Sequence, residues 1–477
     1  MKYGYIKMYI GGELKDSVSS EKKAVICPGT EEIIAEVAWA GKEDAEIALQ
    51  SAQRGFQQWS KYPLSERTKW MLKLRDAIIE KEQLLRESIM DEMGKPYEET
   101  AEDYEIINAL EWYPEEMKRK RDEVLPDIEN THRHQIVTQP AGVAVAFLPW
   151  NFPLLCVGFK LGPALAAGCA IIIRPSSSSP LSAYLLGEIC QEIDFPKGVI
   201  NILCGPVDPV CITLSTSKIP RVLTMIGSSE AGRNLVAQGA HSIKKMSLEL
   251  GGNAPAIVFD DADIAKAATE IAAIKFGNCG QICVTPNRIF VHKEVIGEFL
   301  ELFVENVRNI RVGFGKESKP TMGPMISPQA REKVDKMVKD AIADGAQVMH
   351  GGRIPENLQR GYFYEPTVLR NVTSEMRVYR EEIFGPVAPI IEFDDEDDVL
   401  LQANDTEYGL ASFLYTSNEK RIRKFSESLQ FGEVMINGYK WSIYLPHIGI
   451  KESGIGQDCS HLALDEYLDK KRVTVKC

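Results

Sequence analysis

Hydrophobic positions recur with a helical period in the first quarter of the chain and in short apolar runs after it. Apolar residues return every three or four positions over residues 42–57, 64–93 and 97–117, which predicts a helix over each range. After residue 140, apolar runs alternate with helical segments such as 181–193. Wholly apolar strands separated by helices are typical of a parallel sheet covered on both faces. The strands predicted here are VAVAFLPW, AIIIR, GVINIL, VLTMI and MSLEL.

A second series of the same kind begins after Gly251 and Gly252. It indicates a second α/β unit. Two polar, strand-prone segments, residues 119–139 and the tail 467–475, fit neither series, and such segments can pair with another subunit. The second series consists of predicted strands over 255–259, 288–291, 387–393 and 433–436, and of predicted helices over 264–276, 295–309 and 329–344.

Composition and charge narrow the classes of function. The chain has 55 Lys and Arg against 68 Asp and Glu, and the net charge of −13 disfavours a nucleic-acid-binding surface. No apolar stretch is long enough for a membrane span or a signal peptide, so we expect a cytoplasmic protein with no membrane partner. The 10 cysteines fall at irregular positions without a zinc-binding spacing, which indicates reduced thiols and no metal site.

Three residues in separate segments are candidates for covalent catalysis. Cys283 ends the glycine- and amide-containing segment FGNCGQIC, where backbone N–H groups can stabilise a thiolate, although a lone cysteine is more often a buried structural residue. Glu249 lies between Leu248 and Leu250, and apolar neighbours raise a carboxyl pKa towards the range of a general base. Its alternative role is a helix cap or an ion pair. Asn151, in LPWNFP, can donate to an oxyanion or can serve only as a turn residue.

Taken together, these motifs resemble the aldehyde dehydrogenase superfamily. LPWNFP, RPS, IGSSEAGR, LELGG, NCGQIC, EEIFGPV and KESGIG occur in the order and spacing of that family, from about Ile26 to the C-terminus. The wording of LELGGNAP and ANDTEYGL is closest to the succinate-semialdehyde dehydrogenase branch. The resemblance implies an NAD(P)-dependent oxidation of an aldehyde to a carboxylic acid, carried out by a homodimer or a homotetramer.

The resemblance also implies an architecture. We expect an α/β fold of two doubly wound parallel-sheet domains, a Rossmann-like cofactor domain and a catalytic domain, with a small β oligomerisation arm. The cofactor domain is expected at residues 1–118 and 140–250 and the catalytic domain at 251–452. The oligomerisation segments are expected at residues 119–139 and 453–477.

The resemblance assigns roles residue by residue. Cys283 falls on the nucleophile, Glu249 on the general base, Asn151 on the oxyanion donor and Lys160 on a lysine that relays protons. The implied course is attack by the Cys283 thiolate, a thiohemiacetal, loss of hydride to the nicotinamide, and hydrolysis of the resulting thioester by water that Glu249 activates. The positions that correspond to the cofactor site are Trp150, Arg174, Ser176, Ser177, Gly227, Ser228, Gly232, Glu382 and Phe384.

Two departures from the family concern the cofactor. Arg174 replaces a lysine, and Ser177 stands where NAD-preferring members carry a glutamate. A carboxylate there would repel a 2′-phosphate, whereas a serine beside an arginine accommodates one, so NADP is favoured and NAD is the alternative. In the NAD alternative, Arg174 would hold only a ribose hydroxyl.

Other departures concern the substrate. Phe159 and Gly277 occupy the positions of the two arginines that hold the distal carboxylate in succinate-semialdehyde enzymes. A carboxylate tail without a cation would be buried unpaired, so an uncharged aromatic or aliphatic aldehyde is expected. The alternative is an NADP-dependent succinate-semialdehyde dehydrogenase in which Lys440 supplies the charge. The expected lining of the substrate pocket is Phe152, Leu155, Phe159, Gly277, Trp441 and Tyr444.

Other readings of the same residues are a CoA-acylating enzyme, a binding protein that has lost catalysis, and a cysteine hydrolase. Glu249 argues for hydrolysis over transfer to CoA, and the three filled catalytic positions argue against lost catalysis. No histidine is predicted to lie where it would activate Cys283, which argues against a cysteine hydrolase. If helical turns persist between Cys279 and Cys283, the two thiols share a face, and oxidation would join them.

Overall fold

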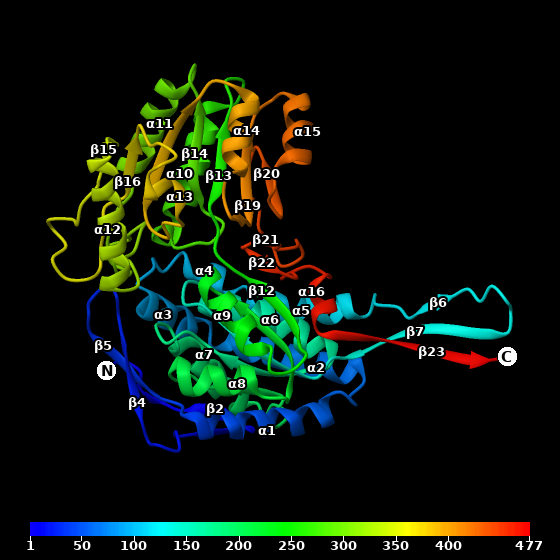
Figure 1. The fold of residues 1–477 in the computed structure, drawn as a ribbon. Coiled ribbons are helices and arrows are strands. Elements are labelled where there is room, and N and C mark those ends of the chain that lie inside the picture. Colours follow the sequence, from blue (N-terminus) through cyan, green and yellow to red (C-terminus); the bar gives the residue numbers. More distant parts are fainter.

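The computed structural model describes residues 1–477 as two α/β units, one above the other in Figure 1. Each unit has its own hydrophobic core, one with 77 buried residues and one with 52. The two predicted series of strands and helices therefore form two separately packed units, as the family resemblance implied. None of the helices combines the length and the apolar composition needed to cross a bilayer.

The first unit is built on an eight-stranded sheet in the order β22-β12-β11-β8-β9-β10-β2-β3. Its five central strands, β12 to β10, are parallel. β22 on one side and β2 on the other run antiparallel to them, and the edge strand β3 is antiparallel to β2. Apolar residues fill these central strands because helices cover both faces. The bounds are β2 Met8–Ile10, β3 Glu13–Lys15, β8 Val143–Phe147, β9 Ala170–Arg174, β10 Ile200–Ile202, β11 Pro220–Ile226, β12 Lys245–Glu249 and β22 Gly454–Ile455.

Two of the predicted helices of this unit are each divided into two. The prediction of one helix over 64–93 is wrong, because Lys81 leaves the helical region with φ −105° and ψ 15° and a new helix begins at Glu82. The prediction over 97–117 is likewise replaced by two helices that meet at Glu105. Apolar periodicity continues across both breaks, so the sequence pattern does not reveal them. The helices are α1 Lys42–Trp59, α2 Leu64–Glu80, α3 Glu82–Met93, α4 Thr100–Tyr104, α5 Ile106–Met117, α6 Pro153–Ala167, α7 Leu181–Glu192, α8 Ile212–Thr216 and α9 Ser229–Gly239.

The second unit is built on a seven-stranded sheet in the order β15-β16-β17-β14-β13-β19-β20. All its strand pairs are parallel except β15 with β16. The strands are β13 Ala254–Val258, β14 Pro286–His292, β15 Gln347–His350, β16 Thr367–Arg370, β17 Val387–Phe393, β19 Ala411–Tyr415 and β20 Glu433–Ile436. The helices are α10 Ile264–Phe276, α11 Ile296–Arg308, α12 Pro328–Ala343, α13 Arg377–Arg380, α14 Glu396–Asn404 and α15 Glu419–Ser428.

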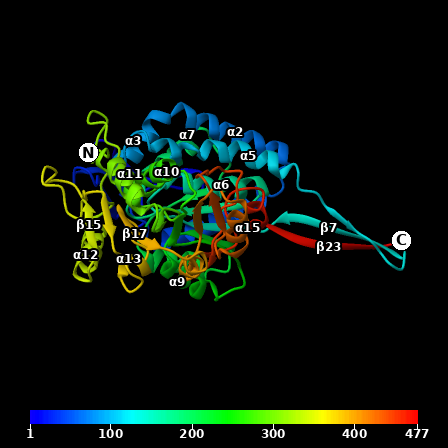
Figure 2. The same ribbon diagram turned by 90° about the horizontal axis from the view of Figure 1, so that it is seen from above.

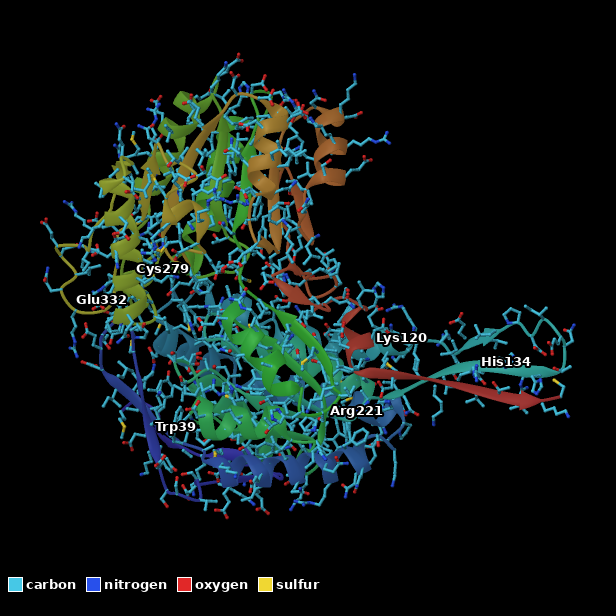
Figure 3. The ribbon with its side chains drawn as sticks, viewed as in Figure 1. Trp39, Lys120, His134, Arg221, Cys279 and Glu332 are labelled. Carbon is cyan, nitrogen blue, oxygen red and sulfur yellow. The ribbon has the colours of Figure 1, made fainter.

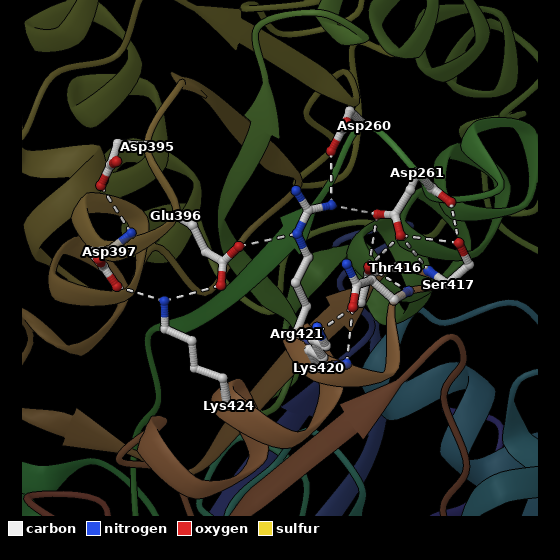
Figure 4. A network of polar contacts seen from close by, with 11 residues as sticks. Asp260, Asp261, Asp395, Glu396, Asp397, Thr416, Ser417, Lys420, Arg421 and Lys424 are labelled. Atoms are coloured by element: carbon white, nitrogen blue, oxygen red, sulfur yellow. Dashed lines mark hydrogen bonds and ion pairs between the residues drawn. The ribbon is translucent and has the colours of Figure 1, made fainter.

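Ion pairs connect α15 to the rest of the second unit (Figure 4). The Arg421 guanidinium pairs with Asp260 at 2.9 Å, with Asp261 at 2.8 Å and with Glu396 at 3.1 Å. Asp261 also accepts hydrogen bonds from Thr416 and Ser417. We call these residues, with Lys424, the Arg421 network.

A three-stranded sheet projects from the first unit as an arm (Figures 1 and 2). It consists of β6 Glu123–Leu125, β7 His132–Pro140 and β23 Leu468–Lys476, and β23 pairs with β7 from Leu468↔Pro140 to Lys476↔His132. His134 lies on this arm and Lys120 near its root (Figure 3). Of the predicted segment 453–477, Gly454–Ile455 joins the large sheet instead, because it pairs with the end of β12.

Smaller elements complete the fold. Near the N-terminus, β1, β5 and β4 form a three-stranded sheet, and β18 pairs with β21 between the two units. A short helix, α16, precedes β23. The bounds are β1 Gly4–Ile6, β4 Lys22–Ile26, β5 Ile33–Ala38, β18 Tyr408–Gly409, β21 Ile450–Lys451 and α16 Ala463–Glu466.

Candidate active site

The two large sheets present opposite ends of their strands to the junction between the units. Glu249 is the last residue of β12, and Asn151 follows β8, so both lie at the carboxyl edge of the first sheet. Only residues 250–253 connect β12 to β13, which places the beginning of the second sheet directly opposite. Cys283 precedes β14, which starts beside β13, with Pro286 paired to Ala254. Segments far apart in the sequence thus meet at one junction.

A glycine lets the nucleophile segment approach this junction. A Cβ atom at Gly252 would lie 2.3 Å from the Cys283 carbonyl oxygen, which no side chain tolerates. The Cys283 backbone N–H donates no hydrogen bond within the chain. A free donor beside the thiol is suited to an oxyanion.

The chain kinks between α10 and Cys283. Asn278 and Cys279 have φ of 46° and 58°, in the left-handed region, so helical turns do not persist. The expectation that Cys279 and Cys283 share a face is therefore wrong. Cys279 is buried in the second unit (Figure 3), and its sulfur lies 3.7 Å from that of Met325. Cys283 is partly exposed, and all ten cysteines are free.

Cys283 lines a cavity of about 800 Å³. Asn151 and five of the six residues expected in the substrate pocket line it too. Tyr444 does not, and its expected place in the pocket is wrong, since it is 47% exposed and faces outward beside Lys440. The five predicted lining residues are Phe152, Leu155, Phe159, Gly277 and Trp441, and Phe159 stacks on Trp441 with ring centroids 5.5 Å apart.

Asn151 is held rigidly with one N–H to spare. Its Nδ2 donates to the Gln281 carbonyl at 3.0 Å, which leaves the second N–H of the amide free. Its backbone carbonyl accepts hydrogen bonds from the buried Lys95 ammonium and from Asn278, both at 3.0 Å. Lys95 also pairs with buried Asp103 at 2.7 Å, a contact that no sequence motif indicated.

Glu249 is a buried carboxyl group without a hydrogen-bond donor. It is 2% exposed, and neither carboxylate oxygen accepts a hydrogen bond from the protein. Burial raises its pKa to about 8, although the charges of His447 and Lys160 act in the opposite direction. The apolar setting predicted from Leu248 and Leu250 is thus present. Glu249 lies behind the cavity lining rather than on it.

His447 lines the same cavity as Cys283 and lies next to Glu249, so the expectation that no histidine is placed to act on Cys283 is wrong. Its Nδ1 bonds the Glu433 carboxylate at 2.5 Å, and its Nε2 lies 3.9 Å from Glu249 Oε2. Burial lowers the pKa of His447, but the charge of Glu433, a hydrogen bond with Cys283 and the charge of Glu249 together raise it well above its usual value. The histidine lies 164 residues beyond the cysteine in the sequence, and no spacing rule connects them.

Lys160 lies one layer further in. Its ammonium pairs with both oxygens of Asp458 at 2.6 Å, and both side chains are buried. Asp458 is joined to His447 by two backbone hydrogen bonds of 2.8 and 2.9 Å. The predicted proton-relay lysine is therefore next to the Glu249 and His447 side chains but does not line the cavity.

The residues expected to bind the cofactor phosphates and ribose lie along the carboxyl edge of the first sheet. Arg174 ends β9, and its Nη2 donates to the Gly205 carbonyl at 2.8 Å while its buried Nε has no partner. Ser176 and Ser177 follow, partly exposed. Ser228 caps α9 by accepting from the Ala231 N–H at 3.2 Å, with Gly227 just before it. Gly232 packs so closely on Leu250 that a Cβ atom would lie 2.5 Å away.

The residues expected beside the nicotinamide also converge. Glu382 accepts from the Gly252 N–H at 2.9 Å, and burial raises its pKa to about 7. The Phe384 ring lies edge-on to Trp150, with centroids 5.5 Å apart. Gly252 touches both Glu382 and the Cys283 carbonyl, so this group adjoins the nucleophile.

The lining of the cavity also carries acidic side chains that sequence reasoning missed. Glu99, Glu102 and Glu105 line it, and all come from the segment at α4. Burial raises the pKa of Glu99 to about 7. Lys440 is the one lysine or arginine on the lining, and its ammonium lies outside, 5.7 Å from the Tyr444 ring centroid. No group of three or more His, Cys, Asp or Glu side chains is placed to hold a metal ion.

Comparisons with known proteins agree on one family. The model of the aldehyde dehydrogenase family matches residues 15–473. The mitochondrial succinate-semialdehyde dehydrogenase of rice (Oryza sativa subsp. japonica) is 38% identical over 466 residues, which cover 97% of this chain and 88% of the plant protein. The NADP⁺-dependent succinate-semialdehyde dehydrogenase of Escherichia coli (strain K12) is 37% identical over 468 residues, which cover 98% and 97%.

Solved structures show the same likeness. The crystal structure of betaine aldehyde dehydrogenase from Staphylococcus aureus in complex with NAD⁺ superposes on this chain with a TM-score of 0.95 at 32% identity. The match covers 98% of this chain and 95% of that one.

Proposed function

The chain belongs to the aldehyde dehydrogenase family, and from this premise we propose that Cys283 is its nucleophile, Glu249 its general base and Asn151 its oxyanion donor. The protein is an NAD(P)-dependent enzyme that oxidises an aldehyde. One observation carries the assignment of roles: Asn151 and Cys283, from opposite sheets, line one cavity, and the unpaired Glu249 carboxyl group lies just behind it. Succinate-semialdehyde dehydrogenases among the relatives support the branch that the sequence motifs suggested.

Each residue performs one part of the reaction. The Cys283 sulfur bonds to the aldehyde carbon, and the carbonyl oxygen becomes an oxyanion that accepts hydrogen bonds from the free Asn151 N–H and the Cys283 backbone N–H. The thiohemiacetal loses its hydride and becomes a thioester. Glu249 takes a proton from water, which attacks the thioester and releases the acid and the Cys283 thiolate.

The assignment of the nucleophile is tested by Cys283→Ala. We expect aldehyde oxidation, followed by the absorbance of the reduced nicotinamide, to fall to background, because the thiol that forms the covalent intermediate is removed. Cys477→Ser is the matched control, since Cys477 is exposed at the C-terminus, and it should retain full activity. Undiminished oxidation by the Cys283→Ala protein would disprove the role.

The residues at the carboxyl edge of the first sheet fit a nicotinamide dinucleotide. The buried, unpartnered Nε of Arg174 and the N-terminus of α9 both offer donors suited to anionic groups. Arg174, Ser176 and Ser177 would hold the adenosine ribose, Gly227, Ser228 and Gly232 the pyrophosphate, and Glu382, Phe384 and Trp150 the nicotinamide end. When bound, the nicotinamide supplies the hydride acceptor.

We propose that NADP⁺ is preferred over NAD⁺. Ser177 puts no carboxylate beside the ribose, and Arg174 offers a guanidinium to a 2′-phosphate. The E. coli relative named as NADP⁺-dependent is in keeping with this choice, whereas the S. aureus structure holds NAD⁺.

The cofactor preference is tested by comparing kcat/KM for the two cofactors. We expect Ser177→Glu to weaken NADP⁺ use strongly, because its carboxylate would repel the 2′-phosphate, while Ser178→Glu at the exposed neighbouring position should leave the ratio near the parent value. A parent enzyme with a higher kcat/KM for NAD⁺ would overturn the proposal.

We further propose that the substrate is an uncharged aromatic or aliphatic aldehyde. Phe159 and Trp441 give the pocket an aromatic wall, and Gly277 brings no cation. Glu102 and Glu105 on the lining would repel a distal carboxylate, and the Lys440 ammonium is exposed to solvent beside Tyr444. These charges disfavour succinic semialdehyde, which remains the alternative substrate because of the relatives.

A panel of aldehydes of similar length separates these two substrates. We expect kcat/KM to be highest for benzaldehyde or hexanal and lowest for succinic semialdehyde, with a penalty that shrinks at high salt. Glu102→Gln should raise kcat/KM for succinic semialdehyde more than for hexanal. A preference for succinic semialdehyde in the parent enzyme would reject the uncharged substrate.

We propose that the arm joins subunits in a homodimer or a homotetramer. The arm exposes apolar side chains on a thin sheet, including Val124 at 70% and Val475 at 48% exposure, which a single chain leaves uncovered. Light scattering after size-exclusion chromatography tests this: the full chain should have at least twice the mass of one chain, and deletion of residues 469–477 should reduce it. A monomeric full chain would rule out the proposal.

A further inference from the structure

We propose that His447, anchored by Glu433, is a catalytic residue that donates a hydrogen bond to the Cys283 sulfur and stabilises it as a thiolate. This inference deepens the proposed function, because it rests on Cys283 as the nucleophile. Neither the sequence motifs nor the comparisons assign a role to either His447 or Glu433.

The contacts of His447 leave one nitrogen for the sulfur. Its Nδ1 is bonded to Glu433 at 2.5 Å, so Nε2 is the nitrogen left to donate to the Cys283 sulfur. Two backbone hydrogen bonds to Asp458 fix the main chain of His447, and its ring contacts Phe159 with centroids 6.4 Å apart. The imidazole is thus held from three sides and lines the same cavity as the thiol.

The surrounding charges favour the protonated imidazole. Glu433 faces it at the start of β20, Glu249 faces it at 3.9 Å from the end of β12, and Cys283 faces it from the loop before β14. The Lys160–Asp458 pair lies behind it and is already neutral overall. Among these groups, the protonated His447 is the one cation that faces the thiol, and a cation beside a thiol favours its thiolate form.

The chemical step keeps the proton of His447 in place. The Cys283 S–H bond breaks and its proton passes to solvent water before the aldehyde binds. The sulfur electron pair then forms the bond to the aldehyde carbon, while the electron pair of the C=O π bond moves to the oxygen. His447 donates its Nε2–H to the sulfur throughout. When the thioester is hydrolysed, the C–S bond breaks, its electron pair returns to sulfur, and the same hydrogen bond stabilises the leaving thiolate.

Glu433 is a positioning residue in this arrangement. Its carboxylate fixes the orientation of the imidazole and compensates its charge, so it acts on the sulfur through the imidazole. Loss of the carboxylate is expected to weaken the effect of His447 without removing the imidazole.

The test measures how fast iodoacetamide alkylates Cys283 as a function of pH, without aldehyde or nicotinamide. All proteins carry Cys477→Ser, because Cys477 is exposed, whereas every other cysteine except the partly exposed Cys283 is buried. We expect His447→Asn to raise the pH midpoint of alkylation by about one unit or more, towards that of an unassisted thiol. Glu433→Gln should shift it in the same direction by less. His350→Asn is the matched control, since His350 lines a separate cavity in the second unit, and should leave the midpoint unchanged.

An unchanged midpoint in His447→Asn would overturn the proposal, because a merely structural histidine would alter the amount of folded protein and not the midpoint. If His447→Asn does not fold, the thiolate absorbance at 240 nm is measured instead in proteins that keep His447. The difference between the parent and Cys283→Ala should show a thiolate below pH 7, and its absence would likewise overturn the proposal. Failure of the parent enzyme to oxidise any aldehyde would instead reject the proposed function. The alkylation test does not depend on that activity, because it is run without aldehyde or nicotinamide.

Discussion

Two groups of charged residues in this molecule are built in opposite ways. In the Arg421 network every charge has a partner, and the side chains remain between 21% and 36% exposed for Arg421, Asp260 and Lys424. In the cluster around His447 the side chains of His447 and Glu249 are 8% and 2% exposed, and both Glu249 oxygens lack a donor.

The difference separates a structural group from a reactive one. Partly solvated pairs keep their charges and gain little from each contact, so the Arg421 network serves to hold α15 in place. A buried carboxyl group without donors has a raised pKa and can take up a proton near neutral pH. A buried carboxyl group that lacks hydrogen-bond donors lowers the stability of the fold, but its raised pKa suits a general base.

The largest effect is expected when Glu249 is replaced by glutamine. Glu249→Gln keeps the shape but cannot accept a proton, so thioester hydrolysis should slow by roughly 10²–10⁴-fold. Stopped-flow measurements should show a burst of about one equivalent of reduced nicotinamide per site, followed by slow turnover. A steady-state rate equal to the parent's would show that Glu249 is not the base.

Removal of the oxyanion donor should have the next largest effect. Asn151→Ala deletes an N–H beside the reacting oxygen, and we expect kcat to fall roughly 10²–10³-fold. Single-turnover rates of reduced-nicotinamide formation measure the step in which the oxyanion forms. Asn151→Asp has the same shape without the donor and should lose at least as much. Normal single-turnover rates in both variants would contradict the role.

The pH dependence should report the buried carboxyl group. Because its pKa is raised to about 8, Glu249 is protonated below that pH and acts as a base only above it. Therefore kcat should increase with pH by roughly tenfold per unit below the midpoint and level off above about 8. Steady-state kcat with saturating substrates between pH 6 and 10 gives this profile. A rate that is flat from pH 6 would contradict a raised pKa.

The smallest effect is expected in the Arg421 network. Arg421→Met removes the guanidinium that pairs with Asp260, Asp261 and Glu396 and should lower the free energy of unfolding by about 1–2 kcal/mol, with kcat unchanged. Urea unfolding measures the loss. Arg423→Met, which removes a single exposed pair with Glu427 on the same helix, is the control and should cost less than about 0.5 kcal/mol. A large loss of activity in Arg421→Met would show that the Arg421 network is not purely structural and would contradict the contrast with the cluster around His447.

The sequence by itself determined the elements and most of the chemistry. The apolar runs that became β8 to β14 and the helix over 264–276 follow from local periodicity, which depends only on which neighbours are apolar. Cys283, Glu249 and Asn151 were identifiable because the motifs around them, taken together, resemble those of the aldehyde dehydrogenase family, whereas each residue alone also allowed a structural role. The raised pKa of Glu249 was also predictable, since its immediate neighbours are apolar.

Only the tertiary structure decided which distant side chains meet. The helix breaks at Lys81 and Glu105 and the outward position of Tyr444 depend on packing partners that local pattern does not include. His447, Glu433 and Cys283 come from three segments of the second half of the chain, and their contact exists because parallel strands start at a common edge. Side-chain contacts across a junction between two sheets depend on how the sheets are placed in space, and one-dimensional spacing carries no information about that placement.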